Sequence, residues 1–122
     1  MRILVADDNP ESAKTLGWAL EIFGHEVRVE TSGRKAVEAA AAFLPQIVLL
    51  DIGMPDMDGY AACRAMKQLP GLKKTVFIAQ TGWSREKDLD LAREAGFAHH
   101  LVKPVDIRVL QETVAAAARG IA

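Results

Sequence analysis

Cysteine is almost absent from this sequence, which has one among its 122 residues. A single thiol excludes an internal disulfide and a zinc site built from cysteines, and it fits a reducing compartment. Long apolar runs are missing as well, because no segment approaches the roughly 18–20 residues that a membrane helix needs. The first apolar run ends at Asp7 after four residues, which is shorter than the core of a secretory signal. We therefore expect a cytoplasmic, soluble protein that does not enter the membrane.

A strong charge of either sign is also missing. Fifteen basic residues face sixteen acidic ones, for a net charge of −1, which argues against sequence-independent binding of nucleic acid or anionic membrane. A basic helix-turn-helix tail is absent too, so we expect no direct contact with nucleic acid. Half of the residues are apolar and a quarter are charged, which is typical of a globular chain. At this length we expect one domain over residues 1–122.

Short apolar runs alternate with helical patterns along the chain. The runs that lack internal alternation indicate strands buried on both faces of a parallel sheet. Val27 and Val29 alternate with charged residues, which suits an edge strand. The expected strands lie over residues 3–6, 26–30, 47–50, 76–79 and 97–102. The expected helices lie over residues 10–23, 33–44, 59–69, 85–95 and 107–121.

Local signals support several of these helix boundaries. Asn9, Asp58 and Ser84 are expected caps at the starts of three helices. In the alanine-rich helix, one buried stripe is expected to contain Ala36, Val37, Ala40, Ala41 and Leu44. Strands that alternate with helices predict an α/β fold, a doubly wound parallel sheet with helices on both faces and right-handed crossovers.

Polar residues stand where the predicted strands end. Asp7 and Asp8 follow the first strand, Asp51 the third, Thr81 the fourth and Lys103 the fifth. The carboxyl ends of parallel strands share one edge of the sheet, and ligands bind there near the point where the strand order reverses. We therefore expect three carboxylates, a hydroxyl and an ammonium in one crevice.

Three neighbouring carboxylates repel one another, and a hard cation or a raised proton affinity relieves that repulsion. Carboxylate oxygens suit Mg²⁺, which prefers to bind where a phosphate is also present. A carboxylate beside Mg²⁺ can accept a phosphoryl group as an aspartyl phosphate. The moving phosphoryl oxygens then need positive charge and hydrogen bonds around them, which the metal, Lys103 and Thr81 would supply.

The same residues resemble the response-regulator receiver domains, the CheY-like modules of two-component signalling, over essentially the whole chain. The resemblance rests on four stretches, which are residues 5–9, residues 49–59, Thr81-Gly82 and Lys103-Pro104. It implies a flavodoxin-like five-stranded sheet in the order 2-1-3-4-5. It also implies a signalling domain rather than an enzyme, one that catalyses only its own phosphorylation and dephosphorylation.

The resemblance implies that Asp51 accepts a phosphoryl group from a histidine of a sensor kinase or of a histidine phosphotransfer domain. It implies that Mg²⁺ is bound by Asp8, Asp51 and the main-chain carbonyl of Gly53, with Asp7 acting through a bound water. The output protein or domain is not named by the sequence. The stretch over residues 96–105 is more similar to receivers of hybrid sensor kinases than to those of transcription factors.

Further roles follow from the same resemblance. Lys103 would pair with a phosphoryl oxygen, Thr81 would bind another and move when phosphate arrives, and the Lys103–Pro104 peptide would be cis. His100 stands where the family usually has a switching tyrosine or phenylalanine, and a histidine there allows pH sensitivity. His99 is expected on the opposite face of the strand.

Two positions in the same region concern how long the acyl phosphate lasts. Gly53 and Trp83 lie two residues beyond Asp51 and Thr81, where family side chains tune its hydrolysis. Because Gly53 has no side chain to steer water, we expect a slowly hydrolysed acyl phosphate.

Two other functional classes share parts of this chemistry. A Mg²⁺-dependent phosphatase or phosphotransferase with an aspartyl intermediate usually has an acid two residues after its nucleophile, where this chain has Gly53. A nucleotide- or flavin-binding domain would need a glycine-rich phosphate loop, and both G-x-G-x-x-G and G-x-x-x-x-G-K-[ST] are missing. An EF-hand alignment on Asp56, Asp58 and Gly59 places Met54 at the first ligand position and Ala65 at the last, which argues against a calcium loop.

Overall fold

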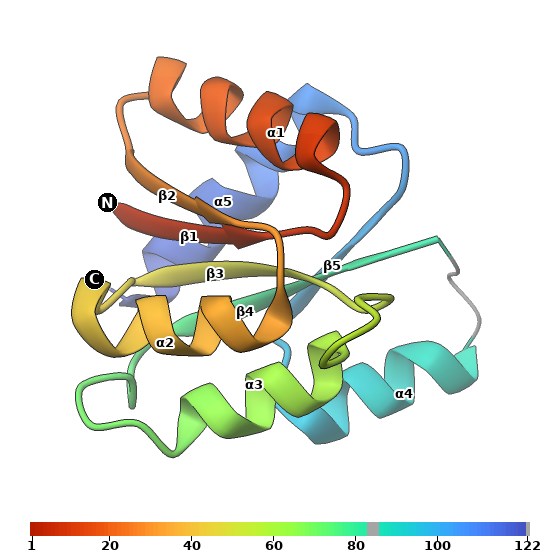
Figure 1. Ribbon diagram of the computed structural model, residues 1–122. Helices are drawn as coiled ribbons and strands as arrows, with labels where there is room; N and C mark the ends of the chain where they lie inside the picture. The colour runs from red at the N-terminus through yellow and green to blue at the C-terminus, as the bar shows by residue number, and fades with distance from the viewer. Residues whose placement is uncertain (83–85, 122) are drawn as a thin grey trace.

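Five parallel strands form one sheet in the order β2-β1-β3-β4-β5 (Figure 1). The computed structural model describes residues 1–82 and 86–121. The strands are β1 (Arg2–Ala6), β2 (Glu26–Glu30), β3 (Ile47–Asp51), β4 (Val76–Thr81) and β5 (His99–Val102). The helices are α1 (Pro10–Ile22), α2 (Gly33–Phe43), α3 (Gly59–Lys67), α4 (Glu86–Ala95) and α5 (Ile107–Ile121). The expected α/β fold, its strand order and the edge position of β2 are confirmed.

Helices cover both faces of the sheet (Figure 1). Helices α1 and α5 pack on one face, where Leu16, Leu20 and Leu110 are buried in one apolar cluster with alternate residues of the strands. Helices α2, α3 and α4 cover the other face, where Met66 and Phe97 belong to a second cluster. Burial on both faces explains why the central strands are continuously apolar in sequence.

Helix boundaries follow local chemistry. The Asn9 side chain accepts hydrogen bonds from the main-chain N–H groups of Glu11 and Ser12, which caps α1 as expected. Helix α2 ends one residue early, because Leu44 takes a left-handed conformation (φ 52°) before Pro45, a residue that disfavours helix in its predecessor.

Strand β5 begins later than expected. The main-chain N–H groups of Gly96 and Phe97 donate to the Ala92 carbonyl at 3.1 and 3.0 Å, so they close the end of α4 rather than pair with β4. Sheet-side bonding starts with Ala98, whose N–H donates to the Phe77 carbonyl at 2.9 Å. The expected cap at Ser84 lies outside the described residues.

The helices of residues 1–82 and 86–121 include none with both the length and the apolar character of a membrane span.

Candidate phosphoacceptor and metal site

Strand register brings the acidic residues together at one edge of the sheet. Ile3 and Val5 of β1, and Ile47 and Leu49 of β3, belong to the apolar cluster between the sheet and helices α1 and α5, which we call the α1–α5 cluster. Because side chains alternate along a strand, Asp51 continues that row at the end of β3. Asp7 follows β1 directly and is fully buried. The acidic residues therefore lie together because they stand at the ends of neighbouring strands, although Asp7 and Asp51 are far apart in the sequence.

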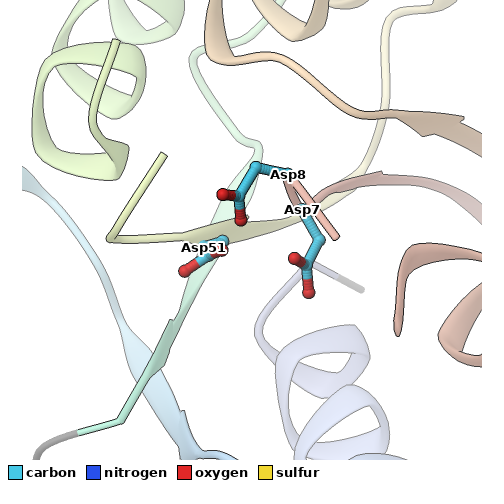
Figure 2. A group of neighbouring side chains, drawn as sticks. All are labelled: Asp7, Asp8 and Asp51. Atoms are coloured by element: carbon cyan, nitrogen blue, oxygen red, sulfur yellow. The ribbon is translucent and has the colours of Figure 1, made fainter. Parts of the chain in front are cut away.

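The three carboxylates form a compact group (Figure 2). One oxygen from each of Asp7, Asp8 and Asp51 lies within 4.8 Å of the others. Lys103 closes the group, since its Nζ lies 2.9 Å from Asp51 Oδ2 and 3.5 Å from Asp7 Oδ2. The exposed Asp8 contrasts with the other two, of which Asp51 is 5% and Asp7 0% exposed. The site therefore has a buried wall and an open side at Asp8.

Main-chain donors fix the two buried carboxylates. The Gly53 N–H donates to Asp51 Oδ1 at 3.0 Å, and the Asn9 N–H donates to Asp7 Oδ1 at 3.0 Å. On Asp51, the Gly53 N–H and Lys103 contact different oxygens, because Lys103 pairs with Oδ2. Asp51 is held in one orientation at the end of its strand.

Burial and charge set the protonation of the group. Burial raises the pKa of Asp7, and a hydrogen bond with Asp51 raises the pKa of Asp8. Burial also disfavours the charged form of Asp51, but hydrogen bonds from Lys103 and the Gly53 N–H outweigh it and hold the pKa of Asp51 below its usual value. Burial opposes the charge on Lys103, yet contact with Asp51 outweighs it and raises the pKa of Lys103. The arrangement keeps an ionised Asp51 beside a charged lysine.

The donor set fits a hard divalent cation. Its oxygens all come from carboxylates, and Mg²⁺ binds through one or two carboxylates while it keeps several waters. Burial raises the pKa of Asp7, and the neighbouring Asp51 carboxylate raises that of Asp8, and a bound divalent cation would offset both effects. The open side at Asp8 gives a cation access from solvent.

The other expected site residues occupy the same edge. Thr81 is the last residue of β4 and is half-buried, and its carbonyl accepts a hydrogen bond from the Lys103 N–H at 2.8 Å. The Lys103–Pro104 peptide is cis. Gly53 is exposed beside Asp51, and a Cβ built on it would lie 3.8 Å from Asp51 Oδ1.

The two histidines of β5 point to opposite faces of the sheet. His100 is exposed on one face of β5, and His99 is half-buried on the other face, which it shares with Leu101. Both line a small cavity of about 110 Å³ with residues of α4. Trp83, the other residue expected to tune hydrolysis, lies outside the described residues.

Sequence reasoning missed Gln80. This residue precedes Thr81, has no exposed surface and sits in register beside Asp51 of β3. A polar side chain that follows Val76–Ala79 in an otherwise apolar strand was the available signal. Only the strand register places it next to the carboxylate row.

Asp56 was also missed as a structural residue. Its carboxylate accepts hydrogen bonds from the Ser32 hydroxyl at 2.9 Å, from the Gly33 N–H at 3.1 Å and from the Arg34 N–H at 3.0 Å. Asp56 thus ties the loop after Asp51 to the start of α2. The hydrogen bond from the Arg34 N–H is the largest of the influences that lower the pKa of Asp56 to about 2.

Replacing Asp56 with alanine is expected to lower the free energy of unfolding by about 1 kcal/mol, the usual loss for a removed helix cap. Because the folded pKa lies below the unfolded value of 3.8, the contribution is complete above about pH 4 and is lost as the pH falls toward 2. Thermal unfolding from pH 2 to 7 measures it. The difference between the wild type and Asp56→Ala should shrink as the pH falls below about 4, and a difference at pH 2 as large as that at pH 7 would contradict this origin.

Comparison with known proteins identifies the family of this chain. The sequence profile of the family described as response regulator receiver domain matches residues 3–115. The chain is 37% identical over 106 residues to the signal transduction histidine-protein kinase BarA of Escherichia coli, covering 87% of this chain and 12% of that one. It is 33% identical to protein PilH of Pseudomonas aeruginosa, covering 98% of both chains.

A solved structure shows the same arrangement of elements. The receiver domain of a sensor histidine kinase from Pseudomonas aeruginosa superposes with a TM-score of 0.85 at 28% identity, covering 98% of this chain and 96% of that one. That structure is described as having a magnesium ion coordinated in its active site cleft.

Proposed function

Because this chain belongs to the response regulator receiver domain family and is a receiver domain of two-component signalling, we propose that Asp51 is its phosphoacceptor. The observation that carries the proposal is the contact of 2.9 Å between Lys103 Nζ and Asp51 Oδ2 within a cluster of three carboxylates. That pairing keeps Asp51 ionised, and an ionised carboxylate is the form that attacks phosphorus.

The donor we propose is a phosphohistidine on a sensor kinase or a histidine phosphotransfer domain. An Asp51 carboxylate oxygen attacks the phosphorus in line with the departing imidazole. The oxygen–phosphorus bond forms as the nitrogen–phosphorus bond breaks, and the imidazole nitrogen takes up a proton as it leaves. The product is an aspartyl phosphate on Asp51.

The neighbouring residues stabilise the charge that moves. Lys103 lies close enough to Asp51 to turn to a phosphoryl oxygen, and Thr81 stands at the end of the adjacent strand as the donor to another. Asp8, Asp51 and the Gly53 carbonyl would hold Mg²⁺ directly and Asp7 through water, and the bound ion would neutralise charge on the transferred group. His100 is proposed as a switch residue whose surroundings change when Thr81 moves.

Transfer of phosphoryl groups to small substrates is the second candidate, since aspartyl-phosphate phosphatases share this chemistry. Gly53 cannot supply a general acid two residues after Asp51. We therefore propose that the domain changes only its own phosphorylation state and passes the signal to an output protein or domain.

The test is incubation with acetyl phosphate and Mg²⁺, followed by intact-mass spectrometry. We expect the mass of one phosphoryl group to be added, and chelation of Mg²⁺ to reduce labelling to background. Steady release of phosphate from p-nitrophenyl phosphate would favour the phosphatase instead. No added mass with Mg²⁺ present would overturn the proposal.

Replacing Gly53 with asparagine is expected to shorten the lifetime of the aspartyl phosphate about tenfold, because an amide there can orient water toward phosphorus. A Cβ at this position is in ordinary contact at 3.8 Å from Asp51 Oδ1, so the substitution fits. Phosphate release after removal of excess donor measures the lifetime. Gly53→Ala is the matched control, and equal decay in both variants would contradict the water-orienting role.

A further inference from the structure

One cavity of about 520 Å³ lies beside the carboxylate cluster, between α1 and the segment that joins β5 to α5. We call it the α1–α5 cavity. Its polar lining comes from Asp7, Glu11, Ser12, Thr15, Gln80 and Lys103. Its apolar lining includes Leu16, Val105 and Ile107. A cavity of this size that combines apolar side chains with polar groups is typical of small-molecule sites.

Buried polar atoms without partners gather in this cavity. In the described part of the chain, the buried side-chain oxygen and nitrogen atoms that lack a hydrogen-bond partner are Gln80 Oε1, Gln80 Nε2 and Asp7 Oδ2. Both residues line the α1–α5 cavity and have no exposed surface. Asp7 Oδ2 forms an ion pair with Lys103 Nζ at 3.5 Å. Burial of a polar group without a partner is costly, so these atoms favour an occupant that bonds to them.

Gln80 is held where an apolar residue would fit. It shares its strand face with Ile78 of the α1–α5 cluster and lies in register between Asp51 and Leu101. A leucine at this position would add to the core without an orphaned amide. The unpaired Gln80 amide therefore lowers the stability of the fold, and a ligand in the cavity that bonds to it would remove this cost.

The charges of the residues that line the cavity favour a positively charged ligand. Asp7 and Glu11 bring two carboxylates, against the single ammonium of Lys103, which Asp51 also contacts at 2.9 Å. Two of the three orphaned atoms, Gln80 Oε1 and Asp7 Oδ2, are acceptors and need donors. We infer that the α1–α5 cavity binds a small organic cation, an amidine, guanidine or amine, whose donors meet Asp7 and Gln80 and whose apolar body packs on Leu16 and Ile107.

Such a ligand would act on phosphorylation as well. On the proposed function, Asp7 and Lys103 belong to the phosphoacceptor site, and both line the cavity. A cation against Asp7 disfavours Mg²⁺ nearby, and coupling of this kind is reciprocal. The cavity would then be a regulatory site in which a ligand lowers the affinity for Mg²⁺.

The test is a titration of the isotopically labelled protein with benzamidine, benzamide and benzoate, followed by amide NMR shifts without Mg²⁺ or phosphate donor. We expect saturable shifts at Thr15, Gln80 and Ile107 with a benzamidine dissociation constant of about 1 mM, weaker binding of benzamide and none of benzoate. Without Mg²⁺ or donor, the result is independent of whether Asp51 is phosphorylated.

Gln80→Leu should keep a dispersed spectrum and weaken benzamidine binding at least tenfold. Thr15→Val, with Thr113→Val on α5 as its control, provides a second variant should Gln80→Leu fail to fold, and it should weaken binding while the control does not. Absence of saturable shifts would show that the cavity holds water only and would overturn the inference. Equal binding of benzoate, or unchanged binding in the cavity variants, would overturn it as well.

Discussion

Replacing Asp51 with asparagine is expected to abolish labelling by acetyl phosphate, a loss of at least about 100-fold that leaves only background mass addition. Asparagine preserves the shape of the side chain but has no anionic oxygen to attack phosphorus. It also removes the partner of Lys103 Nζ at 2.9 Å and one carboxylate of the acidic cluster. Intact-mass spectrometry with Mg²⁺ present measures the effect.

Asp58→Asn is the matched control for that substitution. Asp58 lies on the same loop and caps α3 by accepting a hydrogen bond from the Ala61 N–H at 2.8 Å. It does not belong to the cluster of Asp7, Asp8 and Asp51. We expect Asp58→Asn to be labelled like the wild type. Labelling that survives in Asp51→Asn would move the acceptor to another residue.

Replacing Lys103 with methionine is expected to separate metal binding from phosphorylation. Loss of the ammonium leaves three carboxylates, with oxygens within 4.8 Å of one another, without their cation. Mg²⁺ should bind about tenfold more tightly, because the net charge of the site becomes more negative by one unit. Acetyl-phosphate labelling should nevertheless slow by about 100-fold, since a group that stabilises the transferred phosphoryl oxygens is gone.

The same variant should be less stable without Mg²⁺. Asp7 and Asp51 are buried and lose an ion-pair partner, and the lysine side chain is itself only 32% exposed. We expect a loss of about 2 kcal/mol in the free energy of unfolding, largely recovered at saturating Mg²⁺. Lys74→Met, at an exposed lysine, controls for the loss of charge. Weaker Mg²⁺ binding in Lys103→Met, or labelling at the wild-type rate, would contradict this role.

Much of this site could be predicted from the sequence because strand ends determine it. Apolar runs located β1, β3 and β4, and the polar residue after each run had to lie at one edge of a parallel sheet. Asp51 and Lys103 are 52 positions apart, yet they meet at the same edge of the sheet, at the ends of two strands separated by β4. Thr81 stands on the same edge for the same reason.

Other features depend on contacts that the sequence does not encode locally. The expected buried stripe of α2 is confirmed at Ala36 and Ala40. It was wrong at Ala41, which is exposed, and at Leu44, which lies beyond the helix and is 41% exposed. A one-residue error in the orientation of a helix is enough to exchange these positions.

The long-range hydrogen bonds of Asp56 and the unpaired amide of Gln80 could not be predicted from the sequence either. The reach of Asp56 to the start of α2 joins segments that are 22 to 24 positions apart. The missing partners of Gln80 appear only when the packing around it is known. Both residues are polar groups whose role depends on tertiary neighbours rather than on periodicity.

The most direct measurement is a crystal structure of the protein grown with Mg²⁺ and beryllofluoride, a stable mimic of the phosphoryl group. We expect beryllium bonded to an Asp51 carboxylate oxygen, with Mg²⁺ bound by Asp8, Asp51 and the Gly53 carbonyl. Lys103 and Thr81 should each contact a fluorine. Beryllofluoride on another residue, or Mg²⁺ bound away from Asp8 and Asp51, would contradict it.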